Sequence, residues 1–201
     1  MSTPRRIPKV LSSEEQAALL RTFNRRWPTK CRNRAMVLTM LSTGLRVGET
    51  VALKWEHVDF RTRRLIVREG KGAKDRIVYF DEEVRDAIVE WRGRAPDSPF
   101  VFSTLKGGPM TTTYARQFVK RAAQKAGIAE WERVSPHTFR HTCATELLRE
   151  TGNLRLVQVA LGHSSVQTTQ IYTHVAAVDL ERVMTRRPGL RAVELPNGAV
   201  A

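Results

Sequence analysis

Residues 135–152, SPHTFRHTCATELLRETG, have the pattern of a helix with defined ends. Ser135 is suited to cap the first turn, Pro136 to take the first helical position, and Gly152 to end the helix. Apolar positions recur at helical spacing and predict a face that packs into a core, namely Phe139, Cys143 and Leu147.

His137 and Arg140 lie three positions apart at the start of this helix and therefore share another face. Backbone N–H groups and the helix dipole in the first turn favour an anion, and a phosphate would suit that place. By itself, a His-x-x-Arg pair more often consists of two surface residues that cap a helix. His141 also falls on the polar face, where we expect a structural role.

The overall charge points to a polyanionic partner. The chain has 34 Lys and Arg against 20 Asp and Glu, which gives a net charge of +14. Nucleic acid is the commonest polyanion in a cell, although a merely basic soluble protein is the alternative. No apolar run approaches the roughly 18 residues that span a bilayer, and the two cysteines suit neither a disulfide framework nor a zinc site. We expect a soluble cytoplasmic protein.

The rest of the chain predicts an α+β fold, mainly helical with a small three-stranded antiparallel sheet. Ser12 and Glu15 have the spacing of a capping box and predict a helix over residues 12–26. Two β-branched runs flank the loop EGKGAK, residues 69–74, and predict a hairpin. The third strand is expected at residues 99–104, PFVFST. Further helices are expected over residues 32–44, 45–55, 81–94, 111–127 and 153–162.

Two further motifs carry candidate binding residues. Arg46 follows the helix-ending Gly44 and precedes Glu49 by one turn, so the carboxylate can brace a guanidinium that reaches an oxyanion. Lys71 and Lys74 lie in the glycine-rich hairpin loop. Each feature alone is ordinary, since salt bridges and solvated loop lysines are common.

The stretch LGHSSVQTTQIYTHV, residues 161–175, adds a histidine and a tyrosine. His163 follows the helix-ending Gly162, and Tyr172 lies among small hydroxylated and amide residues. A tyrosine in such polar surroundings is a candidate for chemistry.

The joint occurrence of these motifs in order is far more specific than any one of them. TGLRVGE, a lysine in a glycine-rich hairpin, HTFRHT, LGHSS and a later tyrosine together resemble the tyrosine recombinase family, the phage-type integrases. The resemblance covers residues of about 11–185 and implies the catalytic fold of that family. It implies that the active-site residues are Arg46, Lys71, His137, Arg140, His163 and Tyr172.

The resemblance also implies their roles. Arg46 and Arg140 would clamp the scissile phosphate, and His163 would donate a further hydrogen bond. Lys71 would be the general acid for the leaving 5′ oxygen, and His137 would assist proton transfer, as a base toward Tyr172. Tyr172 would form a 3′-phosphotyrosyl intermediate, and no metal or other cofactor is expected because arginines neutralise the phosphate.

Typical family members carry an N-terminal DNA-clamping domain that has no counterpart in residues 1–10. We therefore expect an N-terminal extension over 1–10, a catalytic domain over 11–187 and a flexible tail over 188–201. The chain reads either as a minimal recombinase, which its native-looking first residues favour, or as an excised domain. In both cases DNA binding should depend strongly on phosphate contacts and salt.

The expected function is site-specific cleavage and rejoining of double-stranded DNA. The alternatives are a DNA-binding regulator with the same fold and a type IB topoisomerase-like relaxing enzyme. The helix over 111–127 is a candidate for the major groove, or equally a solvated face, through Arg116, Lys120 and Arg121; Lys74 is a further candidate for DNA contact. We expect a monomer when free and a homotetramer on DNA, with possible DNA-bending accessory proteins, at the nucleoid and not at a membrane.

Overall fold

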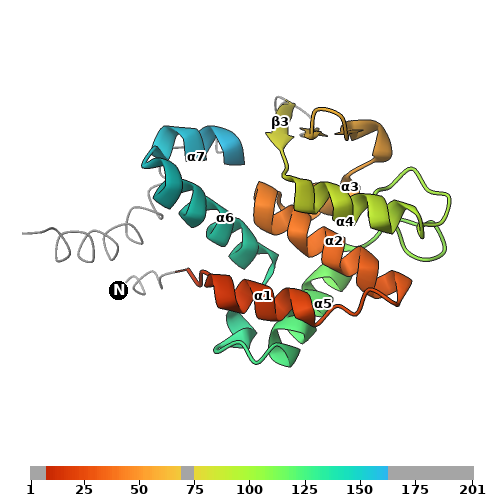
Figure 1. Cartoon of the computed structure of the whole chain (residues 1–201), viewed down its shortest axis with the longest axis horizontal. Coiled ribbons are helices and arrows are strands. Elements are labelled where there is room, and N and C mark those ends of the chain that lie inside the picture. The colour runs from red at the N-terminus through yellow and green to blue at the C-terminus, as the bar shows by residue number, and fades with distance from the viewer. Residues whose placement is uncertain (1–7, 69–74, 163–201) are drawn as a thin grey trace, which may run out of the picture.

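The computed structural model describes residues 8–68 and 75–162 (Figure 1). The described residues are mostly helical, with one small sheet near the middle of the chain. In chain order the elements are α1 (Ser13–Arg21), α2 (Pro28–Thr43), α3 (Val47–Ala52), η1 (Trp55–His57), β1 (Val58–Asp59), β2 (Arg64–Val67), β3 (Arg76–Tyr79), α4 (Glu82–Arg92), α5 (Thr112–Lys125), η2 (Trp131–Arg133), α6 (Pro136–Thr151) and α7 (Leu154–Leu161). This is the mainly helical α+β fold that the sequence predicts.

Helix α1 begins as predicted but is shorter. The hydroxyl of Ser12 accepts from the backbone N–H of Glu15, and the Glu15 carboxylate accepts from the N–H of Ser12, which completes the capping box. The helix ends at Arg21 instead of continuing to residue 26. Pro28 explains part of the difference, because it holds Trp27 in an extended conformation and starts α2 at its own position.

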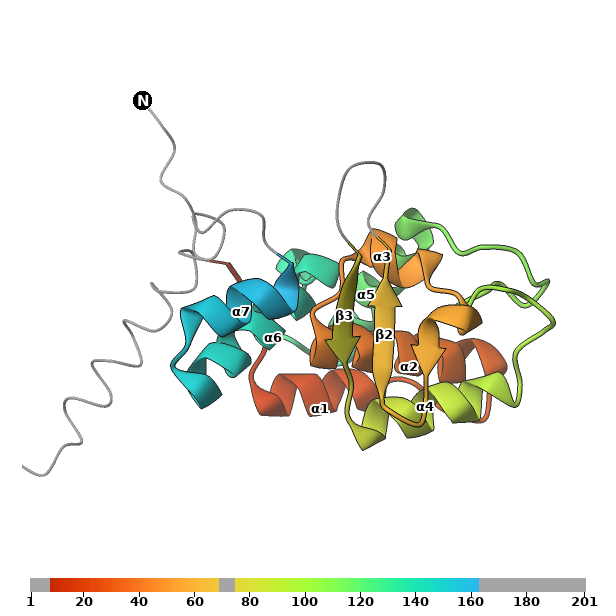
Figure 2. The ribbon, with the colours of Figure 1, turned by 90° about the horizontal axis from the view of Figure 1, so that it is seen from above.

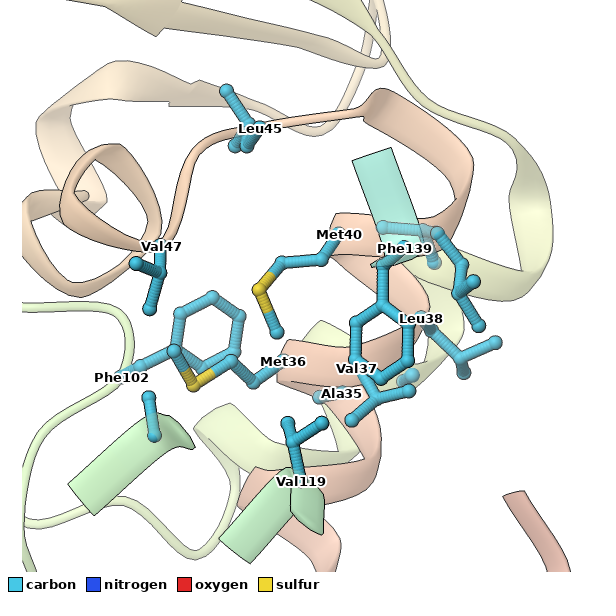
Figure 3. Packing of buried hydrophobic residues seen from close by; sticks show 14 of the residues in the cluster. Ala35, Met36, Val37, Leu38, Met40, Leu45, Val47, Phe102, Val119 and Phe139 are labelled. Atoms are coloured by element: carbon cyan, nitrogen blue, oxygen red, sulfur yellow. The ribbon is translucent and has the colours of Figure 1, made fainter. Parts of the chain in front are cut away.

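Helix α2 lies at the centre of the core. It packs against α4 on one side and α6 on another (Figure 1). In Figure 3, Met36 and Met40 of α2 lie beside Phe102, and Phe139 of α6 packs against the same helix. The buried side chains on nearly all faces of α2 fix the positions of the turns at its ends.

The sheet is antiparallel in the order β1-β2-β3 (Figure 2). Leu65 and Val78 are directly opposite each other and face the core, whereas the neighbouring pair Ile66 and Ile77 is exposed. The sheet therefore covers the core with one face and leaves an apolar strip on the other.

The prediction of a strand over residues 99–104 is wrong. Those residues form only isolated bridges, Lys54 with Phe100 and Ser103 with Pro109, and the third strand is Val58–Asp59. Phe102 and its neighbours are buried in the core, and the backbone N–H of Val101 donates to the carbonyl oxygen of Leu53. A short apolar run such as PFVF, residues 99–102, does not distinguish such a buried segment from a strand.

Helices α6 and α7 form a hairpin on one side of the molecule (Figure 1). Each ends at a glycine with positive φ, Gly152 at 63° and Gly162 at 65°, as the sequence predicts. The backbone N–H of Leu11 donates to the hydroxyl of Thr142, which ties the start of the described chain to α6. None of the helices described is long and apolar enough to cross a membrane.

Candidate active site

Arg46 is placed by the turn between α2 and α3. Gly44 ends α2 in the left-handed conformation, Leu45 is fully buried, and Arg46 caps α3. Glu49 accepts a hydrogen bond from the Arg46 backbone N–H at 2.7 Å and another from its Nη1 at 2.8 Å. The brace that the sequence suggested is therefore present, and it leaves the Arg46 side chain 42% exposed at the surface.

Arg140 lies deeper than the helical pattern suggested. Its residue is only 5% exposed, although the sequence placed it with His137 on a polar face. Nη1 donates to the carbonyl oxygen of Gly44 and Nη2 to that of Leu161, each at 2.7 Å. Arg140 thus joins the turn that carries Arg46 to the end of α7.

His137 lies in the first turn of α6, and much of the residue is exposed to solvent. Partial burial lowers the pKa of His137, and the positive charges of Arg116, Arg140 and Arg46 lower it further. Arg140 also contacts the turn before Arg46, so α6 lies against the start of α3, and the charge of Arg116 on α5 acts on the same histidine. Near neutral pH the imidazole is mainly uncharged and can accept a proton.

His141 follows His137 by one turn and is half-buried. Burial lowers the pKa of His141, and the neighbouring His137 and Arg140 add to this effect. Two neutral imidazoles therefore line the same side of α6. The interpretation of His141 as structural stays a prediction.

The sequence analysis missed Arg76, the first residue of β3. Its Nη1 and Nη2 donate to the two carboxylate oxygens of Glu49 at 3.0 and 2.8 Å. Burial raises the pKa of Glu49, but the hydrogen bonds from Arg76 and Arg46 outweigh it and the pKa is lowered. One carboxylate is thus shared by two guanidinium groups, and this group of three side chains keeps a net charge of +1. No local pattern marks Arg76, because its partner lies 27 residues earlier.

The basic residues predicted on α5 are exposed. Arg116 donates to the hydroxyl of Thr112 one turn before it, and its charge acts on His137. The ammonium group of Lys120 lies 5.7 Å from the ring centre of Trp131, and Arg121 is exposed beside it. Arg116 therefore connects the proposed DNA-facing helix with the candidate site.

Four of the predicted residues lie outside the described part of the chain. They are Lys71 and Lys74 of the hairpin loop, and His163 and Tyr172. The described elements border both segments. Gly162, at the end of α7, immediately precedes His163, and the hairpin loop lies between β2 and β3.

Neither cysteine has the properties of a nucleophile. Both are buried free thiols, and burial raises the pKa of Cys143 to about 12. Within residues 8–68 and 75–162, no group of three or more His, Cys, Asp or Glu is arranged to hold a metal ion.

Comparison with known proteins identifies relatives over most of the chain. Tyrosine recombinase XerD of Ralstonia nicotianae is 41% identical over 97% of this chain and 63% of its own length. Tyrosine recombinase XerA of Thermococcus kodakarensis is 37% identical over 91% of this chain and 64% of its own length. The chain thus spans less than two thirds of the length of these two curated relatives.

Solved structures of recombinases also resemble this chain. The crystal structure of XerA recombinase superposes with a TM-score of 0.78 at 35% identity, covering 91% of this chain and 67% of that one. XerH site-specific recombinase, in a post-cleavage complex with palindromic difH substrate, gives a TM-score of 0.76 at 29% identity, covering 90% and 54%. The sequence pattern of the Phage integrase family matches residues 9–178, and the chain belongs to that family.

Proposed function

We propose that this chain carries the catalytic residues of a site-specific DNA recombinase, which cleaves and rejoins strands through a 3′-phosphotyrosyl intermediate on Tyr172. The observation that carries the proposal is the convergence of two distant places in the sequence: α6, with His137 and Arg140, lies against the turn that carries Arg46, because Arg140 donates to the carbonyl oxygen of Gly44. Residues 11–187 would form the catalytic domain, which agrees with the extent of the family match.

The described residues supply the phosphate-binding part of the reaction. Arg46 and Arg140 carry permanent positive charges that neutralise the non-bridging oxygens and stabilise the additional charge of the pentavalent transition state. Arg46 is exposed enough to reach a DNA phosphate, whereas Arg140 is mainly buried and fixes the surrounding turns.

The proton steps follow from the same arrangement. His137 is mainly neutral and takes the proton from the hydroxyl of Tyr172, whose phenolate attacks phosphorus. The bond from phosphorus to the 5′ oxygen breaks, and Lys71 protonates that oxygen, while His163 donates a hydrogen bond to the phosphate. Rejoining is the reverse attack by a 5′ hydroxyl, so one phosphodiester replaces another and no ATP is needed.

DNA would lie over α5 and the hairpin loop. Arg116, Lys120 and Arg121 are exposed on α5, and Lys74 belongs to the loop sequence. Because Arg116 acts on His137, DNA bound along α5 passes the phosphate site. Such contacts to the backbone give affinity, and base contacts from the same helix give the sequence preference.

We further propose a tetramer on DNA that assembles from free monomers, with DNA-bending accessory proteins where the sites require them, at the nucleoid in the cytoplasm. A groove of about 840 Å³ between β3, α6 and α7 supports contact between copies. It is lined by apolar side chains, including Ile77, Leu156 and Val159, and by the acids Asp81, Glu146 and Glu150. Residues 176–187, AAVDLERVMTRR, combine apolar and basic residues, and those of a neighbouring copy match this groove in character.

The first experiment is covalent trapping on a nicked suicide substrate. Duplex fragments from the genome region flanking the gene are incubated with wild-type protein, Tyr172→Phe and, as a matched control, Tyr79→Phe, which alters an exposed tyrosine of β3. Wild type and Tyr79→Phe should give a denaturation-resistant protein–DNA band in EDTA, and Tyr172→Phe should give none.

Other outcomes identify the competing functions. DNA binding without a band on any fragment would favour a regulator with the same fold. A band together with relaxation of supercoiled DNA that lacks any specific site would favour a topoisomerase-like enzyme.

A further inference from the structure

We propose that Arg76 is a positioning residue for Arg46, and that it acts through the carboxylate of Glu49. The inference rests on the proposed function, in which Arg46 contacts the scissile phosphate. Arg76 itself is 12% exposed, whereas Arg46 is 42% exposed, so the two arginines differ in access to a ligand. Arg76 is placed to hold Glu49, and Glu49 to hold Arg46.

The geometry of the carboxylate supports this order of contacts. Glu49 accepts from both terminal nitrogens of Arg76 and from the side chain and backbone of Arg46. Two parallel hydrogen bonds from one guanidinium to both oxygens of a carboxylate fix the plane of that carboxylate, whereas a single hydrogen bond does not. Arg46 and Glu49 alone would be a local pair three residues apart on a short helix, with several rotamers open to both side chains.

Arg76 is itself confined on its other side. A Cβ atom built on Gly162 would lie 2.7 Å from Cδ and 2.9 Å from Nε of Arg76. The Arg76 side chain therefore passes directly against the backbone of the turn that ends α7 and reaches Glu49 beyond it. Through this one side chain, β3 connects the start of α3 with the end of α7.

The electrostatic consequence also favours a role in binding an anion. Glu49 alone would cancel the charge of Arg46, whereas two guanidinium groups around one carboxylate leave a net positive charge. The second guanidinium, that of the mostly covered Arg76, thus allows Glu49 to orient Arg46 without neutralising the site.

The test compares Arg76→Gln and Arg76→Lys with the control Arg34→Gln in the full chain. Arg34 forms a 2.9 Å ion pair with Glu83 at another place and has the same charge, so its replacement matches the change in net charge. Single-turnover cleavage of the suicide substrate is measured at saturating protein, at a temperature where circular dichroism shows every variant folded.

Arg76→Gln should lower the cleavage rate constant by about 100-fold, the order expected when a reacting group is misplaced by about 1 Å. Its DNA Kd should change no more than that of Arg34→Gln. Arg76→Lys keeps the charge but cannot donate the two parallel hydrogen bonds to Glu49. This variant should remain at least about tenfold slower than wild type. A purely structural role would lower the melting temperature without this loss of rate, and a rate equal to that of Arg34→Gln would overturn the proposal.

A second readout does not need activity. In ¹⁵N relaxation measurements on the free protein, the Nε–H of Arg46, assigned with Arg46→Lys, should be ordered in wild type and Arg34→Gln and mobile in Arg76→Gln. Equal order in all three proteins would refute the positioning role. If wild type forms no adduct through Tyr172, the proposed function fails, and this measurement alone still decides whether Arg76 positions Arg46.

Discussion

The guanidinium of Arg140 donates a hydrogen bond of 2.7 Å to the carbonyl oxygen of Gly44, 96 residues earlier in the chain. This contact joins α6 to the turn that positions Arg46, and the second bond, to Leu161, joins it to the turn before His163. An arginine expected to bind phosphate therefore also holds together the segments on which two other candidate residues depend.

Replacement of Arg140 by lysine should consequently reduce stability as well as cleavage. Lysine cannot span both carbonyl oxygens, so at least one is left without its charged donor. The expected loss in the free energy of unfolding is about 2–3 kcal/mol, measured by urea denaturation. A variant that loses cleavage but keeps its full stability would show that the two carbonyl contacts contribute little to folding.

Gly44 should not tolerate a side chain. Its φ is +65°, and an added Cβ would collide with Cδ2 of Leu161 and lie 3.3 Å from Sγ of Cys143. We expect Gly44→Ala to lower the free energy of unfolding by at least about 1–2 kcal/mol, from the backbone strain and the overlap together.

Gly48→Ala is the matched control for this change. Gly48 has an ordinary φ, lies within α3, and nothing is within 4 Å of an added Cβ. The control should leave stability unchanged or raise it by about 0.5–1 kcal/mol. Equal destabilisation by both replacements would contradict the steric explanation.

The sequence correctly predicted those features that depend on residues close to one another in the chain. The capping box of Ser12 and Glu15, the helix-ending Gly152 and Gly162, and the buried face of Phe139 each depend on residues within one or two turns. The brace from Glu49 to Arg46 has the same local character.

The features that were missed depend on contacts distant in sequence. Residues 99–104 have the composition of a strand, but their backbone pairs with the segment after α3, and the short run Val58–Asp59 takes the place in the sheet. The contact of Arg76 with Glu49 likewise exists only after the sheet has packed against α3. Hydrophobic periodicity predicts the type of a secondary-structure element but not the element against which it packs. Such contacts can therefore be recognised only in the folded structure.

Glu49 should make stability depend on pH in the acid range. Because the folded-state pKa is lowered from 4.5, the contribution of Glu49 is fully present above that value and is lost as the pH falls through the lower folded-state pKa. Glu49→Gln should therefore be less stable than wild type near neutrality, with a smaller difference at acid pH. Glu132→Gln, which removes an exposed carboxylate, is the control. Parallel pH curves for wild type and Glu49→Gln would contradict the lowered pKa.

The cleavage rate should rise with pH through the pKa of His137 and level off near neutrality. Burial and the charges of Arg116, Arg140 and Arg46 place that pKa below 6.5, and the neutral imidazole is the form that accepts the proton of Tyr172. Arg116→Ala removes one positive charge and should move the inflection upward toward 6.5. The measurement is the rate of cleavage against pH, with an NMR titration of the His137 ring in parallel.

Arg121→Ala is the control for this shift, because it removes the same charge from the same helix without acting on His137. It should leave the inflection where it is in wild type. If the ring of His137 titrates at a lowered pKa while the rate shows no inflection there, His137 does not act as the base. If the pKa does not move in Arg116→Ala, the charge of Arg116 does not reach the site, and the placement of α5 beside the scissile phosphate loses its support.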